Sequence, residues 1–186
     1  KWEVRKGHDI LIKAWDKIDQ DNVELWMMCE NPFNSLNEAN YWRNLYDRPN
    51  VKLIPRVNTQ LDVYNIMAEV DCGVFPSRAE GWNLELLELM ACGKHVITTD
   101  YSAHTEFCTK ENSDLIPISS MEPAFDDKWF FGQGSWAKIE DSTIAILAEY
   151  MKNFSSSHQD QINQAGIETS KKFTWSNTVQ EIIKYV

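Results

Sequence analysis

Short runs of apolar and β-branched residues alternate along the chain with longer stretches in which apolar positions recur every three or four residues. The short runs predict strands at residues 23–28, 51–55, 70–76, 95–100 and 115–118. The helical spacing predicts helices at residues 9–18, 37–46 and 60–68. This alternation indicates an α/β fold, in which a parallel sheet is covered by helices on both faces.

The segment 84–91 is apolar on nearly every side except at Glu85 and Glu88, which predicts a buried helix that carries two acids. Beyond residue 118 the alternation stops. We expect the aromatic residues of segment 121–137 to form local core or a domain contact, in preference to a platform for sugar rings. Helices are predicted again at 140–153, 156–172 and 177–186, with a helix–helix turn at residues 155–157.

Length and charge narrow the class of protein. The 186 residues suit one globular domain. Eighteen Lys and Arg against 28 Asp and Glu give a net charge of −10, which opposes contact with nucleic acid or an anionic membrane. The sequence has no apolar run of the roughly 20 residues that a transmembrane helix needs, and its start has no apolar signal core. We therefore expect a cytoplasmic protein with no transmembrane segment.

The four cysteines and four histidines show neither Cys-x-x-Cys nor His-x-x-x-His spacing, so we expect reduced, buried thiols and no metal site. The sequence also lacks a Gly-x-Gly-x-x-Gly motif between a strand and a helix. Hydride transfer with a nicotinamide cofactor therefore has little support.

The loop 77–83 follows a predicted strand and precedes the predicted helix 84–91. Ligands of open α/β sheets bind at the carboxyl ends of the strands, so this loop is a candidate binding site. Asn83 is a plausible N-cap, and Gly81 would let the backbone approach a ligand. The free amides of the helix start, with the helix dipole, would favour an anion such as a diphosphate.

Two acids could complete such a site. Glu88 lies roughly 7 Å along the helix from its start, and a carboxylate there can accept hydrogen bonds from two vicinal hydroxyls of a ribose. Glu80, in the loop, would meet the group that is transferred. The alternative is that Glu80 is a solvated loop acid and Glu88 pairs with a nearby Lys or Arg. The spacing alone leaves both interpretations open.

The whole segment, Pro76-Ser-x-x-Glu80-Gly-Trp-x-Leu-x-Leu-Leu-Glu88-x-Met-Ala-Cys-Gly followed by a Val-Ile-x-Thr strand, resembles the signature of the family-four retaining glycosyltransferases. The resemblance implies that Glu80 lies by the sugar of a nucleotide-sugar donor and that Glu88 holds the ribose. It also implies donor contacts from Gly81, Trp82, Asn83 and Leu84. The implied fold is one Rossmann-like half of a two-domain GT-B enzyme.

The beginning of the chain carries a second likeness. Lys1-Trp-Glu-Val-Arg5-Lys6-Gly7-His-Asp-Ile-Leu-Ile-Lys-Ala14 resembles the basic loop that clasps the donor diphosphate in this family. Lys6 matches the family's lysine. Lys1 takes the earlier basic position if the loop is about one residue shorter than usual, and Arg5 is expected to be an ordinary solvated charge.

Other positions give weaker evidence for a role in the site. Arg56 resembles the place where family members meet the base, although a surface arginine is nearly as plausible, and Tyr64 is expected to pack in the core. After the strand 95–100 the family commonly has Gly-Gly-x-x-Glu, whose glycines are replaced here. Only Glu106 is carried over, with a structural role. The segment Phe173-Thr-Trp175-Ser resembles the stretch that leads into the family's last helix.

The resemblance spans nearly the whole chain and implies that residues 1–186 are the carboxyl-terminal, donor-binding domain. The acceptor, a glycan, a lipid or another molecule, would bind an amino-terminal domain that this chain lacks, so the isolated domain is expected to be inactive. No cofactor is implied, because Lys6 and the helix start would stabilise the leaving group in place of a metal, and Glu80 would orient the sugar. A non-catalytic nucleotide-sugar-binding module remains the main alternative, and an epimerase or phosphorylase a weaker one.

Overall fold

A computed structural model describes residues 1–157 and 161–185 of the chain. Its elements follow the predicted alternation of strands and helices. In chain order they are η1 (Val4–Lys6), α1 (His8–Trp15), β1 (Leu25–Met27), α2 (Leu36–Tyr46), β2 (Val51–Leu53), α3 (Gln60–Glu69), β3 (Cys72–Phe75), α4 (Leu84–Ala91), β4 (His95–Thr99), η2 (Ser102–Glu106), β5 (Asp114–Ile116), β6 (Met121–Phe125), β7 (Phe131–Ala137), α5 (Asp141–Ser157), α6 (Gln164–Ser170) and α7 (Trp175–Ile183).

The parallel strands form two groups. β3, β4 and β5 make a three-stranded parallel sheet with β4 in the centre, where Val74 pairs with Ile97 and Thr98 with Leu115. β1 and β2 form a separate parallel pair, in which Trp26 is opposite Lys52. The predicted parallel arrangement is confirmed, but the sheet is divided between β1 and β3 in the part of the chain that the structure describes.

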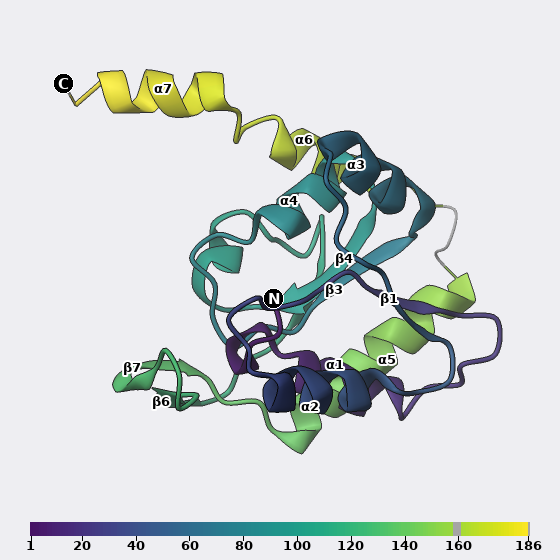
Figure 1. Cartoon of the computed structure of the whole chain (residues 1–186). Helices are drawn as coiled ribbons and strands as arrows, with labels where there is room; N and C mark the ends of the chain where they lie inside the picture. Colours follow the sequence, from purple (N-terminus) through teal and green to yellow (C-terminus); the bar gives the residue numbers. More distant parts are fainter. Residues whose placement is uncertain (158–160, 186) are drawn as a thin grey trace.

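Helices cover both faces of the strands, as predicted (Figure 1). On one side α4 packs against β3, β4 and α6 around a cluster that includes the fully buried Leu86, Met90 and Val96. On the other side α1 and α5 pack together and join the side chains of Ile97 and Ile116 in the larger core cluster. Burial of these apolar faces provides the main stabilisation of the fold.

Segment 121–137, whose aromatic residues were expected to form local core or a domain contact, is an antiparallel hairpin of β6 and β7 with a register shift between Pro123 and Phe125. Only part of this hairpin is buried in the core. The ring of Trp136 is buried, whereas Trp129 and Phe131 are about half exposed. An edge hairpin buries one face only, which is why its aromatic residues divide in this way.

Three further expectations need correction. Residues 155–157 do not form a turn, because α5 continues through Ser157. Tyr64 is not core, since 56% of its surface is exposed on α3. The thiols are free, as expected, but only Cys108 is buried and the other three are partly exposed. The predicted helix 156–172 corresponds to α6, and the helix 177–186 to α7; their residues 158–160 and 186 lie outside the described part.

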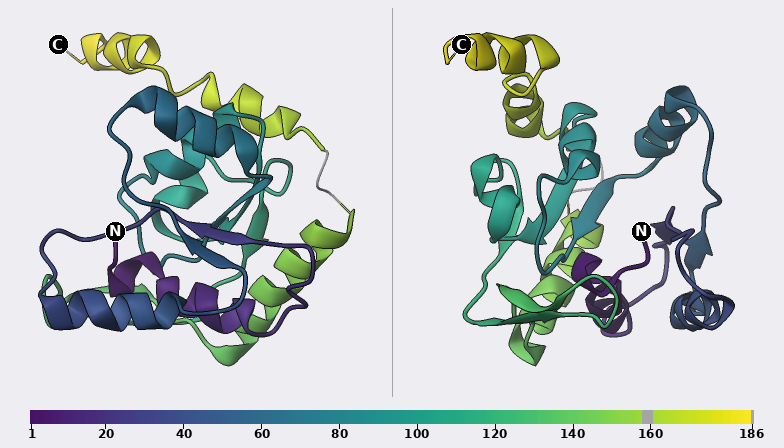
Figure 2. Two further views of the ribbon diagram at one scale, coloured as in Figure 1. Left: turned by 45° about the vertical axis from the view of Figure 1, so that its right-hand side comes forward. Right: turned by 60° about the vertical axis from the view of Figure 1, so that its left-hand side comes forward.

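The last helix, α7, projects away from the body of the domain (Figure 2). Its apolar residues Trp175, Val179, Ile182 and Ile183 recur at helical spacing, and all four are exposed. Within residues 1–157 and 161–185, no helix has both the length and the apolar character needed to cross a membrane.

Candidate functional site

The candidate site lies where the carboxyl end of β3 meets the beginning of the chain. The loop between β3 and α4 is bonded to η1, because the Arg78 amide donates to the Arg5 carbonyl over 2.8 Å. The same loop is bonded to the segment after β4, where the Glu80 amide donates to Ser102 Oγ over 2.8 Å. Three segments that are distant in the sequence are thereby held at one edge of the sheet.

Gly7 permits the close approach of η1 to this loop. Its backbone has φ of 71°, the left-handed region that glycine adopts without strain. A Cβ at this position would lie 2.0 Å from the Pro76 carbonyl oxygen. Glycine is therefore required for both conformation and space, which gives a physical reason for the Lys6-Gly7 pair.

Arg78 fastens the loop from the other side. Its guanidinium makes a bidentate contact with the Asp9 carboxylate of α1, at 2.9 and 2.8 Å, and also donates to the Val4 carbonyl. Two parallel N–H···O bonds fix the orientation as well as the distance between partners. Arg78 therefore anchors the loop to η1 and α1 at the base of the site.

Glu80 is the centre of the charged cluster. Its carboxylate lies 2.6 Å from Arg5 Nη1 and 2.8 Å from Lys6 Nζ, and only 5% of its side chain is exposed. Burial by itself raises the pKa of Glu80, but the positive charges of Lys6 and Arg5 outweigh that effect and lower it. Glu80 is therefore a carboxylate at neutral pH.

Arg5 is not the solvated charge that its sequence context suggested. Its guanidinium donates to the Ala79 carbonyl over 2.7 Å as well as to Glu80, and it lies 3.1 Å from Glu3. Only 20% of its side chain is exposed. The correction has a tertiary cause, because the loop after β3 folds over η1 and places acceptors 74 and 75 residues away beside this side chain.

Asn83 occupies the N-cap position of α4, but its side chain makes no capping hydrogen bond. Its Nδ2 instead lies 2.9 Å from Nε2 of His104, a residue with no exposed surface. Nδ1 of His104 lies 2.8 Å from Thr98 Oγ1 and 3.1 Å from the Thr99 carbonyl. This pattern fits a neutral imidazole protonated on Nδ1, and burial correspondingly lowers the pKa of His104.

The diversion of Asn83 leaves polar groups in the site without protein partners. Ser77 Oγ and Asn83 Oδ1 are buried without a hydrogen-bond partner among the described residues. These side chains are 2% and 5% exposed. The first amides of α4 also lack a side-chain cap. Buried polar groups normally find partners, so this edge has unused hydrogen-bonding capacity for a ligand.

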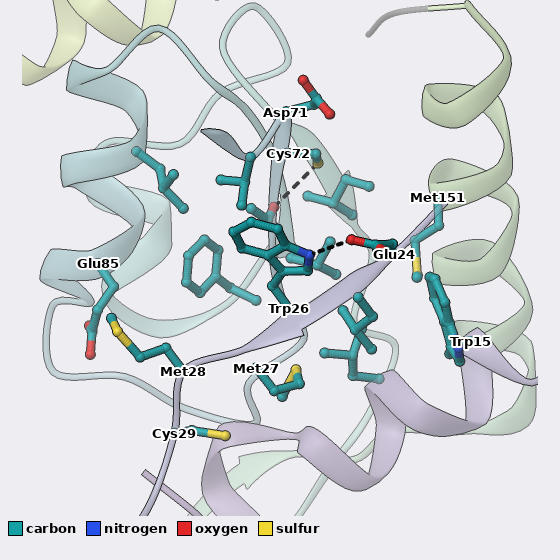
Figure 3. A pocket seen from close by; sticks show the side chains of 18 of the residues that line it. Trp15, Glu24, Trp26, Met27, Met28, Cys29, Asp71, Cys72, Glu85 and Met151 are labelled. Carbon is teal, nitrogen blue, oxygen red and sulfur yellow. Dashed lines mark hydrogen bonds between the residues drawn. The ribbon is translucent and has the colours of Figure 1, made fainter. Parts of the chain in front are cut away.

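Ser77 and Asn83 lie at the mouth of a cavity of about 600 Å³. Lys1, Lys6, Glu80, Asn83 and Glu85 contribute to its polar end. The rest lies between β1 and β3 and is lined mostly by apolar side chains, together with the acids Glu24, Glu69 and Asp71. Figure 3 shows Trp26 and Met27 of β1, Cys72 of β3 and Met151 of α5 around it. The charged mouth and the apolar interior differ sharply in what they could bind.

The structure brings some of the predicted residues together and separates others. Lys1, Lys6, Glu80 and Asn83 all line the cavity, although 56% of the Lys1 side chain is exposed. Gly81, Leu84 and Arg56 are exposed and do not line it. The Trp82 ring packs against Phe107 and Phe173, at centroid distances of 5.1 and 5.2 Å, so it anchors the loop to the neighbouring core.

Glu88 is also exposed and lies outside the lining of the cavity, whereas Glu85, one turn earlier on α4, contributes to it. Burial and then the charge of Glu85 raise the pKa of Glu88. The alternative interpretation, an ion pair of Glu88 with a Lys or Arg, is not found among the contacts of the described residues. Glu88 therefore stays available to a ligand that extends along α4.

Sequence reasoning missed Arg5, Ser77, Arg78 and His104 as parts of the site. Ser77 and Arg78 lie in the predicted loop 77–83, but Arg5 and His104 are distant from Glu80 in the sequence, so only the tertiary structure brings them to the site. Glu106, carried over as structural, is exposed on η2. Among the residues that the structure describes, no group of three or more His, Cys, Asp or Glu side chains gathers in a way that could hold a metal ion.

The fold is that of GT-B glycosyltransferases, and comparison with known proteins gives the family. Residues 2–128 match the family described as glycosyl transferases group 1, and the chain belongs to that family. A comparison with curated proteins found no match.

Solved structures show the same fold. HepE from Anabaena, crystallised with UDP and glucose, is 18% identical with a TM-score of 0.73; the match covers 100% of this chain and 46% of HepE. Sucrose-phosphate synthase from Thermosynechococcus elongatus is 20% identical with a TM-score of 0.68, over 98% of this chain and 42% of that enzyme. This chain thus spans less than half of each.

A third structure matches over most of its own length. It is the carboxyl-terminal domain of a glycosyl transferase group 1 family protein, LpcC from Francisella tularensis, and it is 17% identical with a TM-score of 0.65. The match covers 92% of this chain and 80% of that domain. The present fold is therefore similar to that of a carboxyl-terminal domain of a glycosyl transferase group 1 protein.

Proposed function

We propose that residues 1–186 form the donor-binding half of a retaining glycosyltransferase, which transfers a sugar from a nucleoside-diphosphate sugar to an acceptor bound by another domain. The observation that carries the proposal is the convergence of Lys6, Arg5, buried polar oxygens and the uncapped start of α4 around Glu80 at the carboxyl ends of the strands. The crystallisation of HepE with UDP and UDP-glucose supports this choice of ligand.

The diphosphate would bind between Lys6 and the start of α4. Both elements present positive potential, and the amides of a helix start are directed at an anion. As the bond to the sugar breaks, negative charge accumulates on the leaving diphosphate, and fixed positive groups stabilise that charge without a metal ion. Lys1, at the more exposed side of the mouth, would add a second basic contact.

The remaining donor groups have separate places. Glu80, held as a carboxylate by Arg5 and Lys6, would accept hydrogen bonds from the sugar hydroxyls and orient the ring. Glu88 would accept from the ribose along α4, and Arg56 would lie toward the base. Gly81, Trp82 and Leu84 would shape the loop through their backbone. We also propose that the transferred sugar retains its configuration and that the enzyme acts in glycan synthesis in the cytoplasm.

Titration calorimetry of the parent chain with UDP, GDP and ADP, each compared with its nucleoside, tests the binding step. Lys6→Ala should weaken the diphosphate roughly 10- to 100-fold, the equivalent of a lost charge-assisted contact of ~1.5–3 kcal/mol. The nucleoside should be almost unaffected. Lys152→Ala removes an exposed lysine of α5 and serves as the matched control.

Two results would contradict this proposal. Equal binding of the diphosphate by the parent and by Lys6→Ala would show that the basic loop does not contact phosphate. Collapse of binding with excess chelator, with recovery on adding magnesium or manganese, would show that a metal supplies the charge. A transfer assay on the longer protein with labelled donor then separates an enzyme from a non-catalytic binding module.

A further inference from the structure

His104 links the central strand β4 to the start of α4 through a chain of buried polar contacts. Its Nδ1 lies 3.1 Å from the Thr99 carbonyl oxygen, and its Nε2 lies 2.9 Å from Nδ2 of Asn83. A carbonyl oxygen can only accept a hydrogen bond, so Nδ1 carries the proton. Burial disfavours the doubly protonated ring, and Nε2 is therefore a bare acceptor.

This tautomer of His104 fixes the direction in which the Asn83 amide faces. The oxygen and the nitrogen of a carboxamide have nearly the same shape, so the neighbouring groups decide between the two orientations. Because Nε2 of His104 accepts, only Nδ2 of Asn83 can face it, and Oδ1 is turned away from the ring. Oδ1 then has no hydrogen-bond donor among the described residues, although only 5% of Asn83 is exposed.

The loop around Asn83 does not supply the missing donor. Asn83 has φ of 76°, in the left-handed region, and its side chain makes no bond to the first amides of α4. Ser77, in the same loop, is fixed by its carbonyl, which accepts from Thr99 Oγ1 over 2.8 Å, but its own Oγ is buried without a partner. Both residues line the cavity. The loop therefore brings two uncharged, unsatisfied oxygens to the polar end of the cavity.

The chemistry of these oxygens distinguishes between the parts of a nucleotide-sugar. A diphosphate esterified at both ends has no proton to donate at neutral pH, and its charge is repelled by an amide oxygen and by the nearby carboxylate of Glu80. A sugar hydroxyl is neutral and can donate a hydrogen bond to Oδ1. Lys6 and the uncapped amides of α4 remain as the donors that an anion needs. The start of α4 thus combines donors for an anion with an acceptor for a hydroxyl.

From these observations we infer that Oδ1 of Asn83 recognises one hydroxyl of the transferred sugar, and that His104 is the positioning residue that keeps this oxygen available to the sugar. The inference rests on the proposed function, because it adds a contact within the same donor site. A buried acceptor without a donor carries a desolvation cost, which a correctly placed hydroxyl relieves and a sugar lacking that hydroxyl does not. Asn83 is therefore a determinant of sugar specificity, and it contributes little to binding of the diphosphate.

The test uses the glucose ester of whichever nucleoside diphosphate the parent chain binds most tightly among UDP, GDP and ADP. Calorimetric titration compares this ester with its monodeoxy forms, each of which lacks one sugar hydroxyl. At least one deoxy form should bind the parent about 5- to 20-fold more weakly than the full sugar, the loss expected for a missing hydrogen bond to a buried acceptor. This ratio of affinities is the deoxy penalty.

Asn83→Gly removes the amide without backbone strain, since glycine adopts φ of 76° freely. The deoxy penalty that belongs to Asn83 should disappear in this variant, whereas penalties due to other residues such as Glu80 should remain. The affinity for the free nucleoside diphosphate should equal that of the parent.

His104→Phe keeps a ring in the buried position but removes the acceptor, so the Asn83 amide can turn. The same deoxy penalty should disappear, while the affinity for the free diphosphate is unchanged or higher, because Nδ2 can then face the phosphate. His104→Gln restores an acceptor oxygen and should recover part of the penalty. A merely structural His104 would instead weaken all these ligands to the same extent.

Circular dichroism melting establishes that each variant is folded, and nitrogen NMR of the His104 ring in the parent gives a readout that needs no ligand. If His104→Phe does not fold, Asn83→Gly and the ring spectrum decide the test. Deoxy penalties that Asn83→Gly leaves unchanged, with diphosphate binding retained, would overturn this inference alone. A proton on Nε2 of neutral His104 would also overturn it, since Asn83 would then turn Nδ2 to the cavity. A parent that binds none of the three diphosphates would refute the proposed function and this inference with it.

Discussion

The charged cluster around Glu80 gives the sharpest prediction, because one substitution should affect stability and ligand binding in opposite directions. Glu80→Gln keeps the shape of the side chain but removes the negative charge that both Arg5 and Lys6 contact, at 2.6 and 2.8 Å. Two largely buried cations would then face each other without a counter-charge. The folded state should lose stability, while an anionic ligand should meet less competition for Lys6.

The magnitude follows from the burial of the partners. Removing one member of a fully buried ion pair costs about 3–5 kcal/mol. Here the Arg5 and Lys6 side chains are 20% and 17% exposed, and glutamine can still accept a hydrogen bond, so we expect a loss of about 2–3 kcal/mol. For a domain of this size that loss lowers the melting temperature by roughly 4–12 °C.

The effect should also depend on pH. The folded-state pKa of Glu80 is lowered, so its stabilising contribution is fully present above the unfolded-state value of 4.5 and is lost as the pH falls through the lower folded-state value. The difference in stability between the parent and Glu80→Gln should therefore be constant near neutral pH and shrink below pH 4.5.

Urea unfolding and calorimetric titration with UDP would measure the two effects on the same samples. Glu106→Gln, an exposed acid on η2, is the matched control and should change neither. UDP affinity of Glu80→Gln should equal or exceed that of the parent, although sugar transfer by the longer protein should fall. The same urea midpoint for Glu80→Gln and the parent would refute this account of the cluster, and so would a loss of UDP affinity in the substituted protein.

Three other predictions concern single positions. Gly7→Ala should destabilise the fold by at least about 2 kcal/mol and weaken UDP binding, because a Cβ there meets the Pro76 carbonyl; Gly132→Ala, with φ of 88° and open space around it, should cost only the backbone strain of about 1 kcal/mol. The pKa of His8 is lowered to about 3 by burial, so the free energy of unfolding should fall by about 1.6 kcal/mol between pH 6.5 and 5, and His8→Gln should flatten that slope in urea titrations. Glu88→Gln should weaken UDP by ~1–3 kcal/mol but leave a dideoxyribose analogue unaffected; equal losses for both ligands in calorimetry would remove the ribose contact from the proposal.

The sequence by itself determined the local features of this protein. The alternation of apolar runs and helical spacing predicted the parallel α/β arrangement, since strand and helix periodicities are properties of neighbouring residues. The position of the loop 77–83 before a buried helix indicated a candidate binding site, which stays a prediction. The spacing of Glu80, Glu88 and Lys6 indicated the family, to which residues 2–128 are matched.

Only the tertiary structure decided which of these groups meet. Arg5 was expected to be solvated, yet it pairs with Glu80, 75 residues away, because the loop after β3 folds over η1. Asn83 was expected to cap α4, yet its side chain reaches His104, which the turn after β4 brings beneath it. The division between β1 and β3 likewise has no local signal, because pairing of parallel strands joins residues that are distant in the chain and depends on what else fills the sheet.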